Sequence, residues 1–171
     1  LYNVACTLRA FARIQARYPH ATLTVVGQGS EAVGLRSMAA RLGLRNVTFT
    51  GWIPEAEKAD HYRLADLYVM PSRGEGFGFV LLEAMACGIP VALTTIRPFA
   101  VLPDEAVLRY PYGEPEAVVP VIAAMTNAEK RRVLRVAGLA CARTYTLDKV
   151  LDRMEAAFAA EGAPVIHGGP V

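Results

Sequence analysis

Residues 67–94 read LYVMPSRGEGFGFVLLEAMACGIPVALT and contain, in order, a short strand, a glycine-rich loop, a helix and a second strand. The strands are predicted at 67–70 and 89–94, and the helix at 79–87. Strands that are apolar along their whole length and alternate with helices are typical of a parallel sheet covered on both faces. This stretch therefore predicts an α/β fold.

The same alternation extends to both sides of this stretch. Upstream, β-branched or apolar runs predict further strands at 21–26 and 47–50, and amphipathic segments predict helices at 2–17, 31–42 and 54–64. Downstream, the pattern predicts three helices, at 114–125, 128–144 and 147–160. We therefore expect a Rossmann-like, doubly wound parallel sheet followed by C-terminal helices.

The pattern also predicts the domain organisation. Residues 1–160 form one domain, and the Gly-, Pro- and Ala-rich residues 161–171 form a tail. Because a helix is already under way at the first residues, we expect the chain to be a fragment whose first strand lies upstream of Leu1.

Composition excludes several classes of protein. The chain has 171 residues, of which 53% are hydrophobic and 20% charged, so it can bury a large core. A net charge of +2 is too small to indicate a nucleic-acid partner. The three widely spaced cysteines match neither a zinc site nor a disulfide framework, and we expect no metal. The cysteine pattern suits a reduced setting, so we expect a cytoplasmic location, and no apolar run is long enough to span a bilayer.

The candidate site centres on two glutamates. Glu75 and Glu83 are separated by seven residues within an apolar, glycine-rich context, where carboxylates are costly unless they are hydrogen-bonded. A polyhydroxylated ligand would supply such partners, because a carboxylate can accept hydrogen bonds from two vicinal hydroxyls, as in a ribose. Gly76 and Gly78 let the backbone approach a ligand just before a helix N-terminus, where a diphosphate is favoured.

Two other loops are expected at the same edge of the sheet, because ligands of open parallel sheets bind at the carboxyl ends of the strands. Gly27 and Gly29 follow the strand at 21–26, and Trp52 and Ile53 follow the strand at 47–50. Simpler interpretations remain open. The glycines can be plain strand-to-helix turns, Trp52 can cover the sheet edge, and the two glutamates can be solvated surface residues.

Two motifs carry a family resemblance. PSxxEGFG at residues 71–78 and LEAMAxGxPV at residues 82–91 together resemble the signature of retaining glycosyltransferases with the B-type (GT-B) fold, in particular glycosyltransferase family 4, also described as glycosyl transferases group 1. LTVVGxG at 23–29 and VxFxG at 47–51 resemble the strands that precede this signature. The resemblance is good over about residues 1–95 and loose beyond them.

The resemblance implies that the chain is the C-terminal, donor-binding half of such an enzyme. Glu75 would act as the catalytic residue by contacting donor-sugar hydroxyls near the reacting carbon, and Glu83 would hold the ribose. The remaining donor-binding residues implied are Ser72, Gly76, Phe77, Gly78, Gly27, Gly29, Trp52 and Ile53. The family normally needs no metal or cofactor, because basic side chains and helix N-termini carry the diphosphate charge.

The implied activity is that of a hexosyltransferase in polysaccharide or glycoconjugate biosynthesis. A sugar would pass from a nucleotide-diphosphate sugar to an acceptor hydroxyl with its anomeric configuration kept. The acceptor, whether a glycan, a lipid or a small molecule, would bind mainly to a missing N-terminal domain. The family's basic Arg/Lys pair would also lie upstream, so we expect the fragment alone to be inactive.

Two alternative identities stay open. The chain can be a nucleotide-binding or interaction module that has lost turnover, or an unrelated Rossmann-like protein that carries the motif by chance.

Basic side chains near residue 130 are most simply a solvated helix face, but they also fit a peripheral contact with the inner face of a membrane. The side chains concerned are Lys130, Arg131, Arg132 and Arg135.

Overall fold

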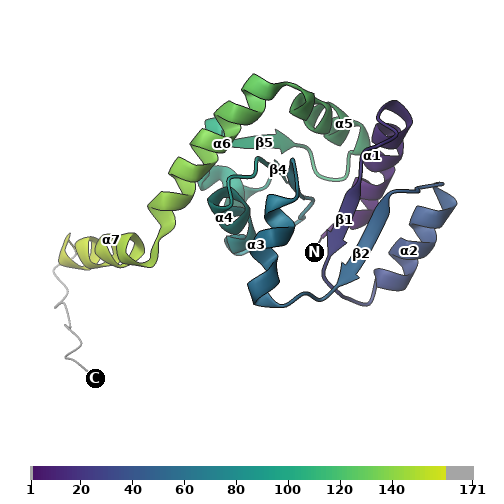
Figure 1. Cartoon of the computed structure of the whole chain (residues 1–171). Coiled ribbons are helices and arrows are strands. Elements are labelled where there is room, and N and C mark those ends of the chain that lie inside the picture. Colours follow the sequence, from purple (N-terminus) through teal and green to yellow (C-terminus); the bar gives the residue numbers. More distant parts are fainter. Residues whose placement is uncertain (1, 161–171) are drawn as a thin grey trace.

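The computed structural model describes residues 2–160, and it confirms the alternation of helices and parallel strands that the sequence predicts (Figure 1). The strands are β1 (Leu23–Val26), β2 (Val47–Gly51), β3 (Tyr68–Met70), β4 (Val91–Thr94) and β5 (Val107–Tyr110). The α-helices are α1 (Val4–Arg17), α2 (Ala32–Arg41), α3 (Glu55–Arg63), α4 (Phe79–Ala86), α5 (Pro115–Ala123), α6 (Ala128–Ala142) and α7 (Leu147–Ala160). The predicted tail, residues 161–171, and any upstream strand lie outside the described residues.

The strands pair in two groups. β1 pairs with β2, and β3, β4 and β5 pair in that order, with every pairing parallel. Parallel pairing was expected, but the division was not. Within the described residues, no pairing joins β1 or β2 to the three-stranded group.

β4 lies at the centre of the three-stranded group, and all four of its residues are buried. Val91 and Leu93 belong to a core cluster that includes residues of α4 and α6, whereas Ala92 belongs to a second cluster with residues of α1 and α5. Alternate residues of a strand point to opposite faces. The three-stranded sheet is therefore covered on both faces, as its apolar strands predict.

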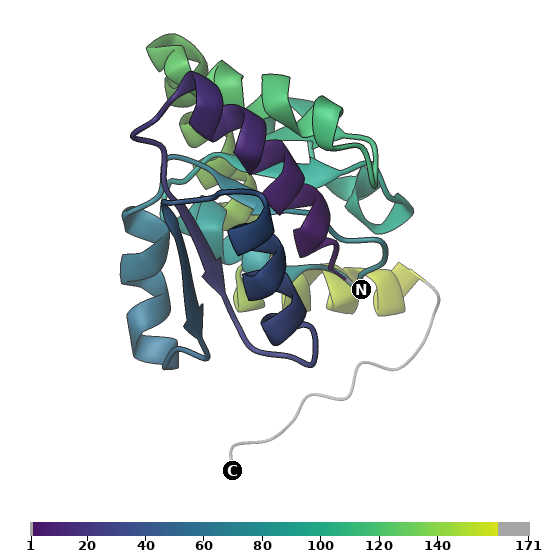
Figure 2. The ribbon, with the colours of Figure 1, turned by 90° about the vertical axis from the view of Figure 1, so that its right-hand side faces the viewer.

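Helix α1 connects the two groups of strands. It packs against α5 of one group and α2 of the other, and Figure 2 shows it crossing between them. At its start, the Asn3 amide donates to the Pro71 carbonyl at 2.8 Å, just beyond the end of β3. Its N-terminus therefore lies at the carboxyl edge of the sheet, beside the glycine-rich loop.

The C-terminal helices differ in how they pack. Helix α6 packs against α4 and is capped at its N-terminus by Asn127, whose side chain accepts a hydrogen bond from the Lys130 amide at 2.9 Å. Helix α7 extends away from the main body (Figure 1), and its Leu147 is 72% exposed. In the described part of the chain, no helix is both long and apolar enough to cross a membrane.

The sequence patterns missed β5. It has only four residues, and Arg109 interrupts its apolar run. The structure accommodates Arg109 because its guanidinium donates to the Asp104 carboxylate at 2.7 Å and to the carbonyls of Phe99 and Leu102. Arg109 thus donates hydrogen bonds to carbonyl groups of the segment that precedes its own strand. Short-range periodicity in the sequence cannot indicate such an arrangement.

A buried hydrogen bond ties the glycine-rich loop to β4. Thr94 is 1% exposed, and its hydroxyl donates to the carbonyl of Ser72, which is fully buried. Ser72 follows β3 by two residues, so this bond fixes the start of the loop against the next strand of the sheet. A buried carbonyl is expensive to leave without a donor.

We predict that Thr94→Val lowers the free energy of unfolding by about 1–3 kcal/mol, because valine keeps the shape and β propensity but removes the hydroxyl. Chemical denaturation followed by circular dichroism measures the change. Thr48→Val, at an exposed position of β2, is the matched control and should change stability by less than about 0.5 kcal/mol. Equal effects of the two substitutions would contradict the anchoring role of Thr94.

Candidate functional site

Glu75 lies half-buried in the loop between β3 and α4. The Ser72 hydroxyl donates to its Oε1 at 2.8 Å. Partial burial, followed by the charge of Glu75 and a side-chain hydrogen bond with it, raises the pKa of Tyr2. The Ser72 hydroxyl of its own loop thus holds the Glu75 carboxylate, and Tyr2, from the residues preceding α1, lies close enough for the charge of Glu75 to affect it.

Glu83 lies on α4 and is held by a different element. The Tyr62 hydroxyl of α3 donates to its Oε2 at 3.0 Å, and Lys58 Nζ is 3.7 Å from the same oxygen. The Glu83 side chain is 36% exposed, so it is neither fully solvated nor enclosed. The apolar neighbours of Glu83 thus leave it accessible while α3 supplies its polar partners.

Tyr68 is close enough to both glutamates for their charges to affect it. Burial, followed by the nearby Tyr2, Glu83 and Glu75, raises its pKa. Its ring packs edge-on against that of Tyr62, with the centroids 5.6 Å apart. The two carboxylates therefore share a tyrosine-lined environment.

The sequence patterns missed the tyrosines and Lys58 as parts of this site. Tyr2 precedes α1, Tyr62 lies on α3 and Tyr68 lies on β3, at sequence distances that no short motif spans. Only Tyr68 had a usable signal, because it lies in the strand that leads directly into the glutamate loop.

The glycines between the glutamates differ in their freedom. Gly78 adopts the left-handed conformation at the N-cap of α4, with φ of +77°, and a Cβ there would lie 2.9 Å from Cε1 of Phe99. Gly76 has open space around its Cβ position. The Phe77 ring packs between Phe79 and Tyr145, with centroid distances of 5.1 and 5.2 Å. The loop thus enters α4 along a fixed path, with Gly76 exposed at its tip.

The loops after β1 and β2 lie together. The Gly27 amide donates to the Gly51 carbonyl at 2.8 Å, so that amide is engaged within the protein. Gly29 accepts the Ala32 amide at 3.1 Å, and Trp52 is 67% exposed. No hydrogen bond among the described residues joins these loops directly to the glutamate loop. The connection runs through α3, which begins just after Ile53 and carries the two side chains that reach Glu83.

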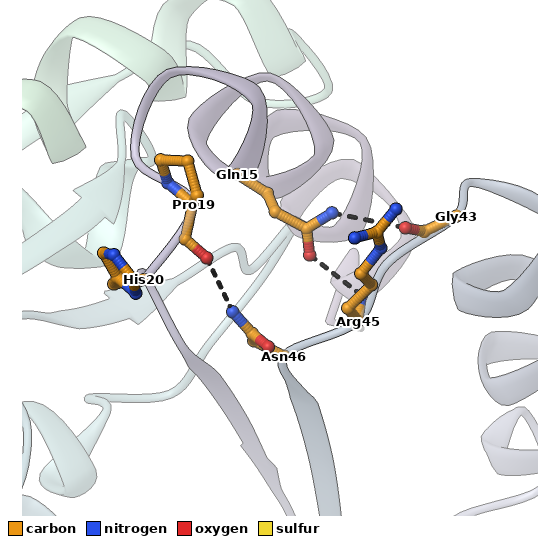
Figure 3. Close-up of a pocket in the computed structure, with 6 residues that line it drawn as sticks. All are labelled: Gln15, Pro19, His20, Gly43, Arg45 and Asn46. Atoms are coloured by element: carbon orange, nitrogen blue, oxygen red, sulfur yellow. Dashed lines mark hydrogen bonds between the residues drawn. The ribbon is translucent and has the colours of Figure 1, made fainter.

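A pocket lies elsewhere, where the chain enters β1 and β2 (Figure 3). It is lined by Gln15, Pro19, His20, Gly43, Arg45 and Asn46. Gln15 bonds the Gly43 carbonyl and the Arg45 amide, and Asn46 bonds the Pro19 carbonyl (Figure 3). These amide side chains fasten one loop to another, and none of the predicted site residues lines this pocket.

Chemically, the site offers two separate carboxylate acceptors, one in the loop after β3 and one on α4. Within residues 2–160, no group of three or more His, Cys, Asp or Glu side chains is arranged to hold a metal ion. The arrangement suits a ligand that presents hydroxyls at two places.

Comparison with known proteins identifies one family. The family model described as "Glycosyl transferases group 1" matches residues 2–128. A D-inositol 3-phosphate glycosyltransferase of Segniliparus rotundus is 34% identical over 161 residues, which cover 90% of this chain and 36% of that protein. The chain therefore spans about a third of the length of this curated relative.

Solved structures share the fold. The pneumococcal O-GlcNAc transferase in complex with UDP and GlcNAc matches with a TM-score of 0.80 at 16% identity, covering 93% of this chain and 33% of that one. The isolated C-terminal domain of a glycosyl transferase group 1 family protein from Francisella tularensis matches with a TM-score of 0.74 at 21% identity, covering 84% and 79%. The match to the isolated domain covers most of both chains, so the two share this fold over most of their length.

We predict that Gly78→Ala lowers the free energy of unfolding by about 2–4 kcal/mol, because alanine disfavours positive φ and its Cβ would collide with the buried Phe99 ring. Gly76→Ala is the matched control and should change stability by less than about 1 kcal/mol. Denaturant titration of both variants measures the difference. If both alanines were tolerated equally, the entry of the loop into α4 would not depend on Gly78.

Proposed function

Because this chain belongs to the glycosyl transferases group 1 family, we propose that it is the nucleotide-sugar-binding domain of a retaining glycosyltransferase with the GT-B fold. The whole protein would transfer a sugar from a nucleotide-diphosphate sugar to an acceptor hydroxyl. The donor, the acceptor and the retention of configuration are all part of the proposal.

One observation carries the proposal: the two signature glutamates both lie near Tyr68 of β3 and are supported by different elements. Glu75 is held by Ser72 at the carboxyl end of β3, and Glu83 is held by Tyr62 of α3. A nucleotide sugar has two hydroxylated rings joined by a diphosphate. We assign Glu75 to the transferred sugar and Glu83 to the ribose, with Gly76, Phe77 and Gly78 between them at the diphosphate.

The diphosphate would be stabilised without a metal. The exposed Gly76 precedes the N-terminus of α4, where unpaired backbone amides and the helix dipole favour anions. Lys58, beside Glu83, is a cation close to the same site. This domain by itself would bind the donor but not turn it over, since a second domain is needed for the acceptor.

A cytoplasmic location, with the acceptor side near a membrane, completes the proposal. Among relatives, one is named phosphatidyl-myo-inositol mannosyltransferase, from Mycobacterium tuberculosis. A lipid-linked acceptor is therefore one of the options for the whole protein.

We predict that UDP or GDP raises the melting temperature of the chain. At ten times the Kd, ligand binding adds about 1.4 kcal/mol of stability, which corresponds to roughly 3–6 °C for a domain of this size. Thermal denaturation with a set of nucleoside diphosphates measures the shift. Absence of a shift with every nucleotide at millimolar concentration would overturn the donor-site assignment.

Glu83→Ala should abolish this rise, because it removes the proposed ribose acceptor. Glu57→Ala is the control, since Glu57 is exposed on the neighbouring helix α3, and it should leave the shift unchanged. A nucleotide shift that survives Glu83→Ala would remove Glu83 from the binding site.

A further inference from the structure

We propose that Tyr62, assisted by Lys58, is a positioning residue that holds one carboxylate oxygen of Glu83 and leaves the other for the ribose hydroxyls of a nucleoside diphosphate. The inference rests on the proposed function, because it assumes that Glu83 faces a nucleotide. Tyr62 and Lys58 would orient the Glu83 carboxylate before the nucleotide binds.

The contacts to Glu83 are divided unequally between its two oxygens. The Tyr62 hydroxyl at 3.0 Å and Lys58 Nζ at 3.7 Å both approach Oε2. Among the side chains that the structure describes, no donor forms a hydrogen bond with Oε1. A carboxylate has acceptor capacity on both oxygens, so a half-occupied one retains strong acceptor sites for an incoming ligand.

Tyr62 is suited to a fixed role because its ring is held by packing. The ring lies edge-on against Tyr68 and packs against the core cluster that contains β4 and α4 residues. Burial, ahead of the nearby Tyr68 and Glu83, raises its pKa, so the hydroxyl keeps the proton that it donates.

The same hydroxyl lies 3.4 Å from the Val80 carbonyl in the first turn of α4. A hydroxyl has one proton, and the shorter bond to a charged acceptor is the stronger one. Tyr62 therefore donates mainly to Glu83, while its position ties α3 to the start of α4.

Lys58 contributes charge rather than geometry. Its ammonium group is closer to Glu55, at 2.8 Å, than to Glu83. The hydrogen bond to Glu55, followed by the charge of Glu83, raises the pKa of Lys58. Its positive charge attracts the Glu83 carboxylate through Oε2 and leaves Oε1 unoccupied.

Holding the carboxylate beforehand would increase affinity. A side chain that is ordered only on binding lowers affinity by the entropy it loses, whereas one fixed in advance does not. The effect should be specific to ligands that carry ribose hydroxyls, because only those would use Oε1. This specificity separates positioning from a general structural role.

The test compares two nucleotides on the full 171-residue chain by isothermal titration calorimetry. The probes are UDP or GDP, whichever binds more tightly, and its 2′,3′-dideoxy analogue, which lacks both ribose hydroxyls. Tyr62→Phe keeps the packed ring and removes only the hydroxyl. We expect this substitution to weaken the affinity for the ribose nucleotide about three- to tenfold and to change the affinity for the dideoxy analogue by less than about twofold. Tyr18→Phe, a half-buried tyrosine at the end of α1, is the control and should change neither affinity.

A double-mutant cycle tests whether Tyr62 acts through Glu83. In the Glu83→Gln background, adding Tyr62→Phe should lower the affinity for the ribose nucleotide by less than about twofold, because the effects of coupled residues are not additive. Full additivity, equal losses for both nucleotides, or no loss for either would each overturn the positioning role. If the unsubstituted chain binds both nucleotides equally, the inference fails while nucleotide binding stands. If it binds neither, the proposed function fails and the inference falls with it.

Discussion

The burial of β4 is the constraint on which the candidate site depends. This strand is enclosed by β3 and β5 at its sides and by helices on both faces, so its position is determined by the core alone. Its last residue, Thr94, bonds the Ser72 carbonyl, and the Ser72 hydroxyl bonds Glu75. Two hydrogen bonds therefore connect the centre of the core to a carboxylate at the sheet edge.

Such a connection explains how a loop carboxylate can be placed accurately. Loops are mobile unless side chains tie them to a rigid scaffold. Here Ser72 is fully buried, and both its carbonyl and its hydroxyl are engaged. Its contribution to a binding site would therefore be to orient Glu75. The second carboxylate, Glu83, is oriented independently by Tyr62, so the two glutamates need not be displaced together.

Local patterns predicted the fold class and the glutamate loop, because both depend on short-range features. Continuous apolar strands indicate parallel pairing, and the glycine-rich signature lies within twenty-one residues of sequence. Non-local pairing decides the rest. Sequence could not show that β1 and β2 pair apart from the other strands, nor that Arg109 could be accommodated within β5. It also missed Tyr62 and Lys58, whose relation to Glu83 exists only after α3 packs against α4.

Helix α3 links the two groups of strands. It begins directly after β2, which belongs to the two-stranded group, yet its side chains reach Glu83 beside the three-stranded group. The Tyr62 ring packs against Tyr68 of β3 and against the core cluster that contains β4 and α4 residues, so the part of α3 that holds Glu83 is fixed to the three-stranded group. Glu75 is tied to the same group through Ser72 and Thr94 of β4. The support of both carboxylates therefore comes from the three-stranded group and the helices packed on it.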